Sequence, residues 1–182
     1  MSLHKDPELK EAVLNLSQKE KDKLLVRLVS KDKMLMKQLH FQLLEGEYDL
    51  EIRIENLRNR LESLLDPNTS GVKNVAMYGN YKALILLLRQ CGGLITEHEK
   101  VTKDKFSEVE FRLLILRISF KNYSFLFQKN HISISEKLNK YIIARLKTTL
   151  NKYEKLHEDF QFDLREDYDY VTSFAATHNL LP

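Results

Sequence analysis

The chain has 182 residues, with 29 Lys and Arg against 26 Asp and Glu, which gives a net charge of +3 at pH 7. Hydrophobic residues make up 43%, too many for a disordered chain, and the length is sufficient to bury a core. The single Cys excludes an internal disulfide, and 5 Gly with 3 Pro are too few for a loop-rich β protein. We therefore expect a globular protein of a reducing compartment, the cytoplasm.

The apolar segments are too short or too charged to cross a bilayer. The longest purely apolar run, residues 83–88, is far below the ~20 residues that a spanning helix needs. The stretch 111–127 contains three basic residues, each costly at the membrane centre. Residues 1–10 are charged and lack the apolar segment of a secretory signal. We expect no membrane association.

Helix-start signals dominate the first 45 residues. Asp6 followed by Pro7 predicts the cap of a short helix over 7–14, because Pro is tolerated in the first helical turn. Ser17 and Glu20 fit a capping box, and the apolar residues that follow recur at spacings of three and four. We therefore predict helices over 18–29 and 31–44 that form an N-terminal αα-hairpin.

A heptad pattern follows at Leu50, Ile54, Leu57, Leu61 and Leu64. Two heptads are too few to indicate a free coiled coil, so this seam predicts a helix packed within the chain. Alternatively, the heptad seam packs against the same seam of a second copy of this chain, so a homo-oligomer remains an alternative. The turn-forming residues 66–71 mark the expected boundary between an N-terminal part, 1–66, and a C-terminal helical bundle, 72–182.

The C-terminal part has three predicted long helices. Residues 83–88 are apolar nearly all round and should lie in the core, with 91–93 interrupting their helix. Residues 106–127 favour a helix, although a buried strand over 112–120 is the alternative. An apolar stripe predicts a helix over 138–160, and a short helix over 170–177 follows. The predicted fold class is an all-α helical bundle of about six to eight helices.

Charge is strongly segregated in this part. Residues 112–152 contain nine basic residues and one acid, whereas 154–169 contain seven acids and two basic residues. On the 138–160 helix, six cations fall on the arc opposite the apolar stripe. These candidate binding residues are Lys137, Lys140, Arg145, Lys147, Lys152 and Lys155. They either pair with the acidic stretch or bind phosphates, an acidic protein or an anionic lipid surface.

Three hypotheses of function follow. The first is a non-enzymatic helical interaction or scaffold protein that binds a protein partner through the basic arc or the heptad seam. The second is a nucleic-acid binder acting through phosphate contacts, although DNA-binding glycine turns, aromatic–basic RNA motifs and zinc ligands are absent from the sequence. The third is a metal-dependent nucleotide hydrolase.

The third hypothesis depends on weak metal-ligand patterns. Glu154 and His157 form one Glu-x-x-His pair, where a di-metal bundle needs two. Glu8-x-x-Glu11 and Glu166-x-x-Asp169 each match half of the magnesium motif of all-α nucleotide pyrophosphatases. Cys91 follows an apolar run and predicts a buried, inert thiol. We identify no catalytic residue and expect no cofactor.

Two segments of the N-terminal part carry a resemblance. Leu16 to Leu28, followed by Leu39 to Glu45, resembles the start of certain uncharacterised all-helical bacterial proteins. The resemblance implies a cytoplasmic bacterial protein without an assigned activity. It brings no functional residues to this chain.

Overall fold

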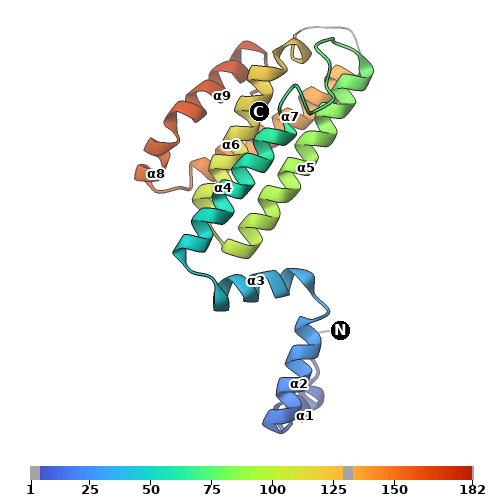
Figure 1. Ribbon diagram of the computed structural model, residues 1–182, viewed down its shortest axis with the longest axis vertical. Coiled ribbons are helices and arrows are strands. Elements are labelled where there is room, and N and C mark those ends of the chain that lie inside the picture. Colours follow the sequence, from blue (N-terminus) through green and yellow to red (C-terminus); the bar gives the residue numbers. More distant parts are fainter. Residues whose placement is uncertain (1–4, 129–132, 182) are drawn as a thin grey trace. The chain divides into compact units, whose positions relative to one another are not determined.

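The computed structural model describes residues 5–128 and 133–181, and all its regular elements in these ranges are helical (Figure 1). The chain divides into two compact units, residues 1–45 (unit 1) and 46–182 (unit 2). The predicted all-α fold is confirmed. None of the described helices has the length and apolar composition of a membrane span.

Unit 1 holds three short helices: α1 Pro7–Leu14, α2 Gln18–Val29 and α3 Lys33–Leu44. Side chains cap α1 and α2 as the sequence predicts. Asp6 accepts a hydrogen bond from the Leu9 amide at 3.0 Å, and the Ser17 amide donates to Glu20 at 2.9 Å. α2 and α3 are joined by a short turn and contact each other, which makes the N-terminal helical pair.

The helices of unit 1 bury little apolar surface. None of the described residues 5–45 is buried. Large apolar side chains of all three helices are exposed: Leu9, Leu14, Leu25, Val26, Leu28, Met36, Leu43 and Leu44. Isolated helices of 8 to 12 residues are marginal in water, so the described contacts of unit 1 give it little stability.

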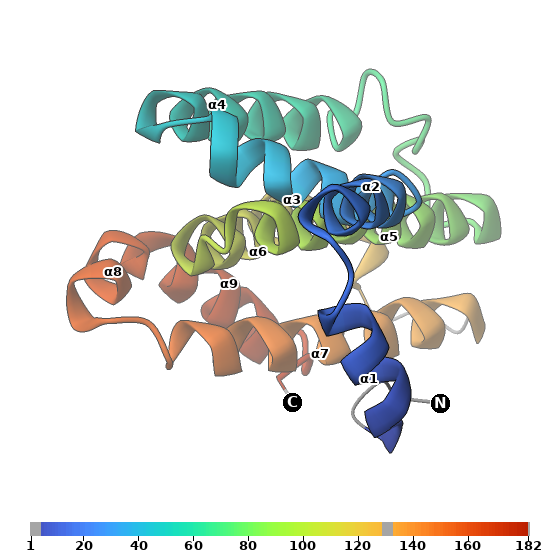
Figure 2. The ribbon, with the colours of Figure 1, turned by 90° about the horizontal axis from the view of Figure 1, so that it is seen from below.

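Unit 2 is a layered bundle. Its elements are α4 Glu47–Leu64, α5 Tyr78–Thr102, α6 Lys105–Asn122, the 3₁₀ turn η2 Ser124–Leu126, α7 Ser133–Tyr153, α8 Glu158–Asp163 and α9 Arg165–Thr177. Figure 2 shows α5 and α6 as a middle layer, with α4 on one side and α7 and α9 on the other. α6 contacts α4, α5, α7 and α9, and ten of its 18 residues are buried.

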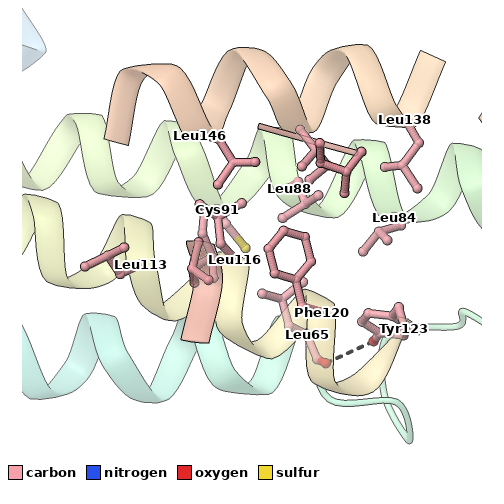
Figure 3. Packing of buried hydrophobic residues seen from close by; sticks show 14 of the residues in the cluster. Leu65, Leu84, Leu88, Cys91, Leu113, Leu116, Phe120, Tyr123, Leu138 and Leu146 are labelled. Atoms are coloured by element: carbon pink, nitrogen blue, oxygen red, sulfur yellow. Dashed lines mark hydrogen bonds between the residues drawn. The ribbon is translucent and has the colours of Figure 1, made fainter. Parts of the chain in front are cut away.

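The core of unit 2 forms around α6. Leu116 and Phe120 of α6 meet Cys91 of α5 and apolar residues of α7 (Figure 3). The Tyr123 hydroxyl donates to the carbonyl of Leu65 at 2.9 Å, which ties the end of α6 to the end of α4. One continuous apolar cluster therefore joins all three layers.

Two open points of the sequence are resolved by this packing. Residues 112–120 lie within helix α6, so the strand alternative is wrong. The heptad seam of α4 faces the core: Leu61 is buried, while Ile54, Leu57 and Leu64 pack against the buried cluster. The division between units consequently falls at 45/46, ahead of α4, whereas the sequence places a boundary at 66–72.

Two predicted helix limits need correction. α5 continues through Cys91, Gly92 and Gly93 without interruption, because those positions keep helical hydrogen bonding. α7 ends at Tyr153, so the predicted helix over 138–160 is wrong beyond that residue. The Tyr153 hydroxyl donates to the carbonyl of Gln161 at 2.7 Å, and this contact folds α8 back towards the end of α7.

Candidate functional site

The six predicted binding cations separate into two places. Lys137, Lys140 and Lys147 are exposed on one side of α7 and Arg145 is exposed on its flank, and we call these four residues the α7 basic face. Lys152 and Lys155 lie instead on the wall of a cavity at the end of the helix. Lys155 is outside α7, in the turn that follows it. The single basic arc predicted from the sequence is therefore two separate features.

The α7 basic face does not meet the acidic stretch. Within residues 5–128 and 133–181, none of its four cations has an ion pair. The acidic stretch is held elsewhere, because Glu166 and Asp167 pair with Arg117 of α6, at 2.9 Å for Glu166. The α7 basic face is thus not neutralised by the described acids, and Lys129 of the basic segment lies outside the described residues.

A second helix extends the basic surface. The guanidinium carbons of Arg89, from α5, and Arg145, from α7, lie 5.8 and 5.4 Å from the ring centre of Tyr141. Burial raises the pKa of Tyr141, while the two arginines act in the opposite direction. Neither arginine has a carboxylate partner among the described residues. Two cation–π contacts therefore fix two unpaired guanidinium groups beside one ring.

A buried ion network joins α6 to the end of α7. Glu108 is 3% exposed and accepts from Arg112 Nε at 2.9 Å and Nη2 at 2.7 Å. Its second carboxylate oxygen accepts from Lys152 Nζ at 2.8 Å. A buried carboxylate needs such partners, because desolvation costs several kcal/mol per ion. Glu108 thereby holds the ammonium group of Lys152 at a fixed place.

Lys152 lies on the wall of a cavity of about 410 Å³, which we call the α6–α7 cavity. The cavity is lined by Glu99, Lys105, Glu108, Val109, Thr148, Asn151, Lys152, Lys155 and Leu156. These residues come from the end of α5, the start of α6, the end of α7 and the turn after it. Residues close together in space are therefore as much as 57 positions apart in the sequence, from 99 to 156.

The predicted metal pair is not brought together with other ligands. Glu154 and His157 lie in the turn between α7 and α8, where His157 caps α8 by accepting from the Asp159 amide at 3.4 Å. Among the described residues, no group of three or more His, Cys, Asp or Glu side chains has a metal-binding arrangement. The Glu-x-x-His spacing places Glu154 and His157 on one face only if a helix continues through them, and α7 ends at Tyr153.

The pyrophosphatase half-motifs lie in different units. Glu8 and Glu11 belong to α1 of unit 1, and Glu166 and Asp169 to α9 of unit 2. Both α9 acids have cationic partners, since Glu166 pairs with Arg117 and Asp169 lies 3.7 Å from Arg165. Each half-motif therefore belongs to a separate unit, and the two α9 acids are engaged by arginines.

The thiol of Cys91 and the side chains of His98 and Ser107 are also buried in unit 2. Cys91 is fully buried as predicted, and burial raises the pKa of its thiol to about 11. His98 Nε2 lies 2.9 Å from Ser107 Oγ, and the side chains of both residues are buried in the bundle. Because Ser107 is completely inaccessible, this pair has no access to a substrate.

Sequence reasoning missed Arg89, Lys105 and Glu108. The four-residue spacing of Glu108 and Arg112 was a usable signal for an ion pair on one helix. Nothing in the sequence indicated that Lys152 would join them. No protein-family model matches this chain, and neither curated proteins nor solved structures include a significant match to it.

Proposed function

We propose that this chain is a non-enzymatic helical interaction protein whose α7 basic face binds an acidic partner protein. The observation that carries this proposal is the group of four exposed cations without carboxylate partners among the described residues. The buried or half-buried arginines of unit 2 differ in this respect: Arg58 pairs with Glu110 at 2.5 Å, and Arg112 with Glu108. Unpaired cations on one helix face attract and orient an anionic partner.

The spacing on α7 favours an acidic helix as the partner. Lys137, Lys140 and Lys147 are separated by three and seven residues, which places them on one side of the helix. Ala144 is exposed between them and presents only a methyl group. A second helix can therefore approach closely there, with its acids opposite the three ammonium groups.

A nucleic acid is the second candidate partner. The observation that favours it is the ring of Tyr141, which has the guanidinium carbons of Arg89 and Arg145 at 5.8 and 5.4 Å from its centre. Aromatic rings beside cations are typical of single-strand binding surfaces, where bases stack and phosphates are neutralised. Substitutions in the α7 basic face should weaken binding of an acidic peptide under the first candidate function and of a nucleic acid under the second.

The test measures fluorescence anisotropy with two labelled probes of equal net charge: a helical Glu-rich peptide and a single-stranded oligonucleotide. The variant Lys137→Glu/Lys140→Glu/Lys147→Glu reverses three charges of the face. The matched control reverses three exposed cations of α2, in Lys19→Glu/Lys23→Glu/Arg27→Glu. We expect the α7 variant to lose peptide binding and the α2 variant to keep it.

Other outcomes are equally informative. If the oligonucleotide binds and the peptide does not, the second candidate replaces the first, and the slope of log K against log salt gives about −0.7 per phosphate neutralised. If both sets of variants behave alike, or neither probe binds the unmodified protein, the α7 basic face has no such function. Circular dichroism melts check that each variant is folded.

A further inference from the structure

The α6–α7 cavity carries an excess of positive charge. Three ammonium groups line it, from Lys105, Lys152 and Lys155, against the carboxylates of Glu99 and Glu108. Glu108 is already matched by Arg112, which holds one carboxylate oxygen with two N–H groups. Counting Arg112, four cations therefore stand against the two carboxylates of Glu99 and Glu108. The cavity favours an anion.

The hydrogen-bond donors of the cavity are only partly used. Lys152 donates to Glu108 and keeps two N–H groups without a partner among the described residues. Lys105 and Lys155 are exposed and have no ion pair within the described ranges. Asn151 adds an amide group, whereas the Thr148 hydroxyl donates to the carbonyl of Ala144 at 3.0 Å. The free donors are thus mainly ammonium groups.

These donors suit a phosphate better than a carboxylate. A planar carboxylate is best matched by the fork of a guanidinium group, and the fork of Arg112 already contacts Glu108 and Thr96. Several separate ammonium groups instead match the oxygens that a phosphate presents in different directions. Because Glu108 fixes the position of Lys152, one of these donors is already in place before a ligand binds.

The size and the apolar walls indicate what the phosphate is attached to. A volume of about 410 Å³ is at the small end of ligand sites, which span about 300–1,000 Å³. Val109 and Leu156 provide apolar wall beside the lysines. We infer that the α6–α7 cavity binds a small organic phosphomonoester, with its phosphate at Lys105, Lys152 and Lys155 and its organic part against Val109 and Leu156.

Isothermal titration calorimetry of the full chain with three probes tests this inference. The probes are phenyl phosphate, inorganic phosphate and benzoate, which separate the contribution of the phosphate from that of the ring. We expect phenyl phosphate to bind most tightly, inorganic phosphate more weakly and benzoate weakest. Comparable binding of benzoate and phenyl phosphate, or no saturable binding of phenyl phosphate, would overturn the inference.

Variants locate the site. Lys105→Ala/Lys155→Ala removes two exposed charges of the cavity and should weaken phenyl phosphate binding about tenfold or more. Lys140→Ala/Lys147→Ala removes two charges from the α7 basic face and should leave that affinity unchanged. Glu99→Gln should tighten binding, because it removes the one unmatched carboxylate. An equal loss in both lysine pairs would mean that binding follows net charge rather than the cavity.

This site is independent of the proposed function. The Lys105→Ala/Lys155→Ala variant should keep its affinity for the Glu-rich peptide, and the triple charge reversal on α7 should keep its affinity for phenyl phosphate. If the peptide does not bind, the binding of phenyl phosphate can still be measured, and the reverse also holds. Thermal melts of each variant separate a loss of binding from a loss of folding.

Discussion

In unit 1, Asp32 caps α3 by accepting from the amides of Met34 and Leu35, at 2.8 and 3.0 Å. In unit 2, Asp104 caps α6 in the same way, at 3.0 and 3.3 Å from the amides of Phe106 and Ser107. The two helices start alike, yet α3 buries no residue and α6 buries ten of its 18 residues. Local signals begin a helix equally well in both units, but only packing stabilises it.

The largest expected contrast comes from removing apolar side chains. Phe120 is fully buried and stacks on Phe174 with ring centres 4.3 Å apart, whereas Leu25 of α2 is 61% exposed. Phe120→Ala should lower the free energy of unfolding by about 3–5 kcal/mol. Leu25→Ala should change it by less than about 0.5 kcal/mol. Urea denaturation followed by circular dichroism measures both, and equal losses would contradict the contrast.

The next contrast concerns charges. Glu108→Gln removes the carboxylate that Arg112 and Lys152 share in unit 2, and should cost about 2–3 kcal/mol of unfolding free energy. This loss of unfolding free energy is smaller than the loss expected for a fully buried ion pair, because the Lys152 side chain is 39% exposed. Asp22→Asn, at an exposed acid of α2, is the control and should have no measurable effect on the same urea transition. A stabilised Glu108→Gln protein would refute a structural role for the network.

A smaller effect separates helix initiation from stability. Asp104→Ala should lower the unfolding free energy of unit 2 by about 1 kcal/mol, because two amides of α6 lose their acceptor. Asp32→Ala removes the equivalent cap from α3. It should reduce the helical circular dichroism signal and leave the urea midpoint of unit 2 unchanged. A shift of that midpoint by Asp32→Ala would show that the two units unfold together.

The smallest effect is a pH dependence confined to unit 2. Burial lowers the pKa of His98 below 6.5, so the folded protein keeps this ring neutral and binds fewer protons than the unfolded chain. The contribution of the neutral His98 ring to the free energy of unfolding is fully present above the pKa of His98 in the unfolded chain, about 6.5. This contribution decreases as the pH falls through that value, and it levels off below the pKa of His98 in the folded protein. Urea melts between neutral pH and about pH 5 measure this slope. The His98→Gln variant should flatten it, and an unchanged slope would assign it to other groups.

Much of the architecture was predictable from the sequence. The bounds 18–29 predicted for α2 agree with the structure, because the capping signal at Ser17 and the apolar spacing act within a few residues. The heptad seam also predicted correctly that α4 packs inside the chain. Both conclusions depend on periodicity, which is a local property of a helix.

The features that failed depend on contacts that helical periodicity does not describe. The end of α7 at Tyr153 involves Gln161, whose side chain donates to the carbonyl of Leu156 at 2.9 Å in the turn that replaces the predicted helix. The pairing of Arg117 with Glu166 spans 49 residues, so charge counts along the chain gave no indication of it. The α6–α7 cavity was missed for the same reason, since three helices and the turn after α7 supply its lysines and acids.

The central position of α6 has a kinetic consequence. Because α4, α5, α7 and α9 all pack on this helix, its backbone amides become accessible to solvent only when most of unit 2 separates. Hydrogen–deuterium exchange along α6 should therefore be the slowest in the chain and should report the global opening reaction. The amides of α1 to α3 exchange through local fraying, so one exchange experiment reads two opening processes on very different timescales.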